Sequence, residues 1–214
     1  MRKVVIVSTL INLCSASVVG QPIEPKSTFN IELGLPNGVS NPAFKNIMQG
    51  VVNVSIYYQY DFSNHLTVGI GGRYAYFAIN EFKVPVPVYG GMHSVGGFLK
   101  VGYQKFLTER FALDTGIKIG YSEFLFDTDR NDTLGVNPIR TNGIHIEPTV
   151  GLILTADEQN SFRFFSSYAT SGFGFKPSMI GLETFGGYDP SDFNKITGSL
   201  IIGFGYTHYF KKTE

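Results

Sequence analysis

Apolar and polar residues alternate with a period of two along most of the chain from residue 28 onward. Near the C-terminus, for example, Ile202, Phe204 and Tyr206 alternate with Gly203 and Gly205. This period predicts β-strands whose two faces differ. The predicted strands are 28–35, 50–62, 66–79, 94–107, 111–126, 143–155, 162–171 and 195–210. No segment shows the period of an amphipathic helix.

The connections between the predicted strands alternate in length. Short ones lie at 63–65, 108–110 and 156–161, and long ones lie at 36–49, 80–93, 127–142 and 172–194. This alternation places short turns at one end and long loops at the other, as in an antiparallel up-and-down sheet. Eight strands can close so that no edge is left unpaired. The predicted fold is therefore an all-β, closed antiparallel barrel over residues 28–210.

The two faces of the predicted strands differ sharply. One is apolar and uncharged, and the other carries charged residues among many glycines. A water-facing strand surface seldom carries so many glycines, whereas gaps inside a narrow barrel leave room for long side chains. Aromatic residues on the apolar face gather near the strand ends, as in interfacial girdles. The sequence favours a transmembrane barrel with periplasmic turns and extracellular loops over a soluble barrel with its apolar face inward.

The charged residues of the inward face are predicted to pair with one another. They are Glu32, Arg73, Lys100, Asp114, Lys118, Glu147 and Arg163. Eight strands enclose only enough space for side chains, so a network of ion pairs is the expected filling. A gated ion path along these charges is the alternative.

The N-terminus has the pattern of a secretory signal peptide at 1–20, with a basic start, an apolar run and small residues before Gln21. Residues 21–27 are then a periplasmic lead and 211–214 a short tail. The chain has 17 basic and 17 acidic residues, so its charge gives no reason to expect a nucleic-acid partner. Charged residues make up only 16% of the chain, which is low for a protein wet on all sides.

The whole pattern after the signal resembles the eight-stranded outer-membrane barrels of the OmpA and OmpX type, and Gln21 after the signal resembles Bacteroidota-type exports. The resemblance implies an integral outer-membrane location and contact with membrane lipid and lipopolysaccharide. It also implies that the assembly machinery reads a C-terminal aromatic signal, here Phe204, Tyr206 and Phe210, although "KKTE" follows Phe210.

Two further local features carry predictions. Pro148 lies within a predicted strand and cannot donate a backbone hydrogen bond, so a β-bulge is expected there. The stretch "DTL" at 132–134 resembles short Bacteroidota O-glycosylation sites, which makes Thr133 a candidate acceptor.

No catalytic residues, metal site or cofactor are predicted. Outer-membrane lipid A deacylases and acyltransferases use His with Ser and an acidic residue, but none of the four histidines is followed two residues later by a serine, as the deacylase pattern requires. The predicted function is non-enzymatic: a structural or surface-interaction barrel, or an accessory subunit of a larger secretion or biogenesis complex. A small gated pore and a lipid A-modifying enzyme are the alternatives.

The longest loop is predicted to carry the interaction surface, because exposed apolar segments often mark binding sites. Its candidate residues are Phe173, Phe175, Met179, Ile180, Leu182, Phe185 and Tyr188, with help from residues 84–89. The alternative is that this loop folds over the barrel mouth as a lid.

Overall fold

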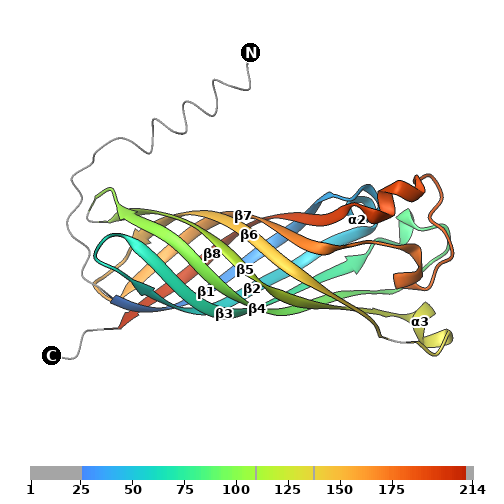
Figure 1. Ribbon diagram of the computed structural model, residues 1–214, viewed down its shortest axis with the longest axis horizontal. Coiled ribbons are helices and arrows are strands. Elements are labelled where there is room, and N and C mark those ends of the chain that lie inside the picture. Colours follow the sequence, from blue (N-terminus) through green and yellow to red (C-terminus); the bar gives the residue numbers. More distant parts are fainter. Residues whose placement is uncertain (1–25, 109, 137, 211–214) are drawn as a thin grey trace, which may run out of the picture.

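A computed structural model describes residues 26–108, 110–136 and 138–210. Its eight strands are β1 (Lys26–Ser40), β2 (Met48–Asp61), β3 (Leu66–Ile79), β4 (Gly90–Phe106), β5 (Phe111–Thr128), β6 (Ile139–Thr155), β7 (Asn160–Gly174) and β8 (Ile196–Phe210). Each is antiparallel to the next, and β8 pairs with β1 to close the barrel. The predicted fold class is confirmed. Figure 1 shows an elongated barrel whose strands are strongly tilted against its axis, with the longer connections at one end.

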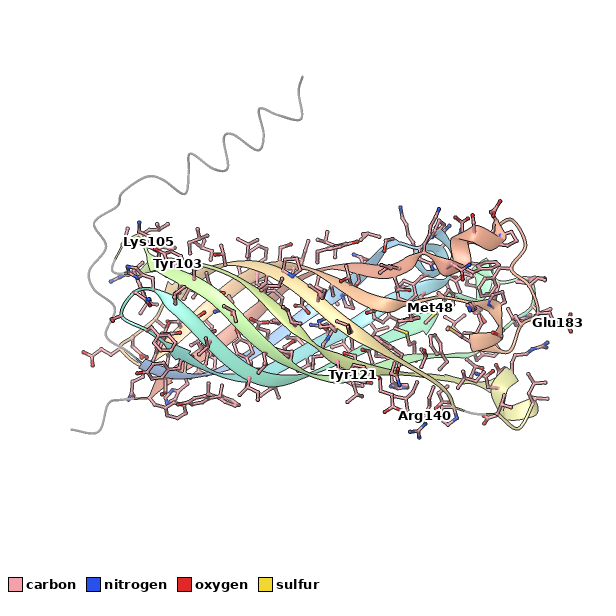
Figure 2. All side chains as sticks on the ribbon, in the orientation of Figure 1. Met48, Tyr103, Lys105, Tyr121, Arg140 and Glu183 are labelled. Atoms are coloured by element: carbon pink, nitrogen blue, oxygen red, sulfur yellow. The ribbon has the colours of Figure 1, made fainter. Side chains whose placement is uncertain are left out.

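The apolar face of the strands is the outer wall of the barrel. Along β5, for example, Phe111, Ile117 and Tyr121 are exposed, while Asp114 and Lys118 are buried. The apolar stretch from Phe111 to Tyr121 matches the roughly 9–11 residues that a tilted membrane strand needs. An apolar band this wide on a closed sheet is the surface of a transmembrane barrel. Tyr103 and Tyr121 lie toward opposite ends of this band in Figure 2.

The strands continue beyond this band at the long-loop end, and there the pattern inverts. On β5, Phe124 and Phe126 point inward and are buried, whereas Glu123 and Asp127 lie on the outer face. Arg140 of β6 pairs with Glu123 at 3.2 Å and projects outward in Figure 2. The barrel therefore protrudes from the membrane. Some predicted strands stop short of the observed ones at this end: β1 reaches Ser40 instead of residue 35, and β4 begins at Gly90 instead of residue 94.

The long connections contain short helices that the sequence pattern did not predict. They are α2 (Pro42–Ile47), α3 (Asp129–Thr133) and the 3₁₀ turns η1 (Glu81–Lys83), η2 (Pro177–Ile180) and η3 (Pro190–Asn194). The side chain of Asn41 caps α2 by accepting a hydrogen bond from the Phe44 amide at 3.1 Å. Within the described ranges, no helix is long and apolar enough to span a bilayer.

The predicted bulge at Pro148 is wrong. Pro148 pairs with Ile117 in an unbroken register between β5 and β6. The pairing of β6 with β7 omits Glu147 and Pro148 and resumes in the same register at Thr149. The missing donor is thus accommodated by a local gap in one ladder. Register shifts occur instead at Gly38/Ser40, Gly50/Val52 and Ser171/Gly174, all near the long loops.

Most of the boundaries predicted near the two ends of the chain fall outside the described residues. The signal peptide at 1–20 and the tail at 211–214 lie outside the described residues, as does most of the lead at 21–27. The first strand begins at Lys26, two positions before the predicted start of the barrel.

Candidate functional site

The seven predicted charged residues all lie inside the barrel and are buried. They come from six strands, β1 and β3 to β7, because each occupies an inward position of its strand. Five of them form one connected group, and Glu147 links this group to Arg73 at the end nearer the long loops.

The group is centred on Glu32. Its carboxylate accepts from Lys118 Nζ at 2.6 Å and from Arg163 Nη1 at 2.9 Å. The hydroxyl of Tyr57 donates to the same carboxylate at 2.7 Å and accepts from Arg163 at 2.8 Å. Tyr57 also places its ring near Lys118, as Phe98 does. One carboxylate therefore contacts two cations, and aromatic faces supply further favourable electrostatics.

Asp114 closes the group on the short-turn side. It lies 3.0 Å from Arg163 Nη1 and 3.2 Å from Lys100 Nζ. Lys100 also donates to Gln59 Oε1 at 2.9 Å, and Gln59 donates to Asp61 at 2.6 Å. These hydrogen bonds extend the network toward the short-turn end of the barrel. Uncharged polar residues fill the lumen there, and one of them, Asn30, accepts a hydrogen bond from Thr207 Oγ1 at 2.6 Å.

Glu147 holds the opposite side of the group. Its carboxylate oxygens lie 3.1 Å from Lys118 Nζ and 3.0 Å from His145 Nε2, and Ser167 Oγ donates to it at 2.9 Å. With the proton on Nε2, His145 donates to Glu147 and its Nδ1 accepts from Arg73 at 2.5 Å. Each contact satisfies a charge that would be costly to bury alone.

A small chamber lies beyond Arg73, toward the long-loop end. Its volume is about 10 Å³. Its walls include Arg73 and the hydroxyl-bearing Ser94, Ser171, Thr197 and Ser199. Four aromatic or sulfur-containing side chains complete them: Phe44, Phe77, Met92 and Phe124. The chamber separates the charged interior from an apolar one.

The apolar interior fills the protruding end of the barrel. Its buried members include Phe44 and Ile47 of α2, Phe77 of β3, Met92 of β4 and Phe126 of β5. Phe44 packs against Phe77 and Phe175 with ring centroids 5.1 and 5.7 Å apart. We call this cluster the cap. It closes the lumen on the side that faces away from the membrane.

The predicted interaction surface of the longest loop belongs to the cap and is not exposed. Phe173, Phe175, Ile180, Leu182 and Phe185 are all buried, and Met179 and Tyr188 are partly buried against them. The prediction of a docking surface is therefore wrong for these side chains, and the lid alternative describes the structure. The physical reason is that the barrel mouth offers apolar partners, so the loop buries its aromatic residues instead of exposing them. Glu183 of the same loop points outward at the far end (Figure 2).

Polar contacts fix the path of this loop. Asn131 Nδ2 donates to the Met179 carbonyl at 3.1 Å and so ties α3 to η2. Asp189 begins η3 by accepting from the Ser191 amide at 2.8 Å, and this hydrogen bond lowers the pKa of its carboxyl.

Exposed apolar residues occur instead on the second and third long connections. Phe82 is 86% exposed and Leu134 is 62% exposed, and Val86, Tyr89 and Val136 are exposed as well. The two connections are joined where the Tyr89 amide donates to Asp129 Oδ1 at 3.0 Å and the Asp129 amide donates to the Tyr89 carbonyl at 3.1 Å. We call these five side chains the apolar rim.

The remaining predicted sites occupy clear positions. Thr133 is exposed at the end of α3, where its hydroxyl donates to the Asp129 carbonyl at 3.0 Å. Phe204, Tyr206 and Phe210 lie on the outward face of β8. Glycosylation of Thr133 and recognition of the three β8 residues by assembly machinery stay predictions.

The lumen contains a His, a Glu and a Ser in contact, but they do not form a nucleophilic triad. Ser167 donates to the Glu147 carboxylate and not to the imidazole of His145. In a Ser-His-acid triad the serine hydroxyl donates to the imidazole, which acts as its base. Among the described residues there is also no group of three or more His, Cys, Asp or Glu side chains arranged to hold a metal.

Sequence reasoning overlooked several residues that matter here. Tyr57 alternates with the outward Ile56 and Tyr58, so its inward direction is readable from the pattern. Phe44 gave no such signal, because α2 is too short to show a helical period. Its role in the cap depends on contacts that only the fold creates.

No model of a known protein family matches the sequence, and no curated protein sequence matches it. Solved structures do. OprG, an outer membrane protein of Pseudomonas aeruginosa, matches with a TM-score of 0.50 and 11% identity, over 92% of this chain and 100% of that one. The chain has the fold of the eight-stranded outer-membrane β-barrels. The predicted resemblance is thus confirmed for the fold.

Two further outer-membrane-type barrels give weaker matches. Neisserial surface protein A matches with a TM-score of 0.49 and 14% identity, over 87% of this chain and 96% of that one. Ail, the attachment invasion locus protein of Yersinia pestis, matches with a TM-score of 0.46 and 16% identity, over 86% and 99%.

Proposed function

We propose that this protein is a closed, non-enzymatic outer-membrane barrel that acts through its outer surface at the extracellular end. It serves either as a surface-interaction protein or as an accessory subunit of a larger outer-membrane complex. The observation that carries the proposal is the filling of the lumen. Ion pairs occupy the lumen within the membrane band and the cap occupies the protruding end, which supports a role at the outer surface over a role of the lumen in transport or catalysis.

The apolar rim is the part of the loops that supports binding. Large apolar side chains in water favour contact with a partner, and loops on a rigid scaffold commonly carry binding residues. Phe82 and Leu134 come from different connections that the contacts of Tyr89 and Asp129 hold together. The rim therefore presents apolar side chains on a fixed base.

The test removes the two most exposed side chains of the apolar rim and leaves the residues of the cap unchanged. Phe82→Ser and Leu134→Ser are combined in the full chain, and the control combines Lys83→Ser with Glu183→Ser, both exposed. Crosslinking followed by copurification from native membranes should lose its partner in the rim variant only. Both variants should fold and remain heat-modifiable on gels. Retention of every partner by the rim variant would instead point to the lipid-facing wall.

A further inference from the structure

The charges of the lumen are balanced overall but not locally. Four buried acids, Glu32, Asp61, Asp114 and Glu147, accompany four buried bases, Arg73, Lys100, Lys118 and Arg163. Asp61 pairs with Thr67, six positions before Arg73 on β3, which puts about 20 Å of strand between the two charges. Asp61 therefore cannot serve Arg73 as a close partner.

Arg73 forms only a long ion pair with its nearest carboxylate, that of Glu147. Its Nη1 is 3.7 Å from Glu147 Oε2, the longest of the buried ion-pair distances in the described part of the chain. Glu147 already contacts Lys118 at 3.1 Å and His145 at 3.0 Å. Arg73 is thus the cation with the least compensation, and its side chain is only 4% exposed. An undercompensated buried charge is costly.

The groups around Arg73 are rich in unpaired donors. Arg73 Nη1 contacts His145 and Nη2 donates to Asn53 Oδ1 at 2.9 Å, but Nε has no hydrogen-bond partner. The hydroxyl of Ser94 and the Nδ2 of Asn53 have none either. Arg73 and Ser94 both line the chamber, and no acidic residue is among its lining residues. A cationic chamber with spare donors suits an anion.

The small volume of the chamber limits the size of the anion that it can hold. A volume of about 10 Å³ accommodates roughly one water-sized occupant. Phosphate, sulfate and carboxylates contain several heavy atoms and are too large for it, whereas chloride is a single atom only somewhat larger than a water molecule. We propose that Arg73 and Ser94 hold one halide ion, chloride under ordinary conditions, in the chamber between the ion-pair network and the cap. The halide places a negative charge beside Arg73, because the Glu147 carboxylate already contacts Lys118 and His145. Phe44, Phe77, Met92 and Phe124 form the apolar part of the wall around it.

The experiment measures how halide affects unfolding of the full chain in detergent. The midpoint of heat modification is followed on gels at constant ionic strength, with sodium chloride exchanged stepwise for sodium gluconate, whose anion is too large for the chamber. A ligand that binds only the folded state raises the midpoint with its concentration. We expect that rise with chloride and bromide, its loss in Arg73→Gln, a shift to higher chloride concentration in Ser94→Ala, and no change in the exposed control Arg140→Gln.

A crystal soaked in bromide provides the second measurement and depends on no variant. An anomalous peak beside Arg73 Nε would support the halide site. A midpoint indifferent to chloride together with no bromide peak would overturn it and assign the chamber to water. A chloride effect that survives in a folded Arg73→Gln protein would also overturn it, because the ion would then bind elsewhere.

Discussion

Individual side chains in the lumen act as shared partners and not as isolated pairs. Glu147 contacts Lys118 and His145 and lies near Arg73, so its removal takes one acceptor from each of them and leaves Lys118 with Glu32 alone among the carboxylates. Removal of Lys118 alone leaves two buried carboxylates short of a cation. Breaking a buried pair from one side commonly costs about 3–5 kcal/mol, while removing both partners together costs far less.

We therefore expect a strongly non-additive double-mutant cycle. Lys118→Met and Glu147→Gln should each lower the free energy of unfolding by about 3 kcal/mol, and the double variant should lose clearly less than the sum. Reversible urea unfolding in lipid vesicles measures these values. The exposed pair Arg140–Glu123 is the control, and its cycle should give a coupling below about 1 kcal/mol. Additive losses at Lys118 and Glu147 would indicate a hydrated lumen.

The sequence reveals which charges face the lumen but not which of them meet. Glu32 and Lys118 are 86 residues apart, and their contact depends on strand tilt and on barrel diameter. Those properties arise from closure of the whole sheet. Inward direction, by contrast, follows from residue parity within one strand, which explains why all seven positions could be predicted.

At the scale of elements, the strands are predictable where they cross the membrane and less so beyond it. Inside the band, lipid strongly favours apolar residues on the outer face, so the alternation is largely regular. Beyond Tyr121, Glu123 faces outward and Phe124 inward, so the same strand shows the opposite pattern. The predicted strand 111–126 still covers this stretch and ends two residues before Thr128, whereas the first predicted strand ends at residue 35, five residues before Ser40.

This inversion predicts that the effect of an outward arginine depends on its height along the barrel. Ile202 lies on the outer face of β8 within the apolar band, and Ile202→Arg should cost about 2–4 kcal/mol and impair folding into vesicles. Asn142 is also outward, but it pairs with Glu123 beyond the band. Asn142→Arg should therefore fold normally. Urea midpoints of both variants measure this, and equal tolerance of the two would mean that the band is misplaced.

At the scale of the whole molecule, the barrel is two cores joined end to end. The part within the membrane has a polar interior and an apolar exterior, and the protruding part has an apolar interior and a more polar exterior. The composition of the longest loop showed that it is apolar, but not that Phe44 and Phe77 would receive it, because those partners come from distant elements. The two cores close the lumen independently, since the ion pairs make no use of the loop.

The last prediction follows from this double closure. Replacing residues 175–188 by a Gly/Ser linker removes Phe175, Ile180, Leu182 and Phe185 from the cap, but leaves the apolar band and the ion-pair network intact. The variant should remain heat-modifiable and carry no steady current in planar bilayers, like the original chain, whereas proteases should cleave its protruding end more rapidly. Glu183→Ser, an exposed change in the same loop, should resist proteolysis as the original does. A steady current from the original chain would support the pore alternative, and a current that appears only after the replacement would make the cap the gate.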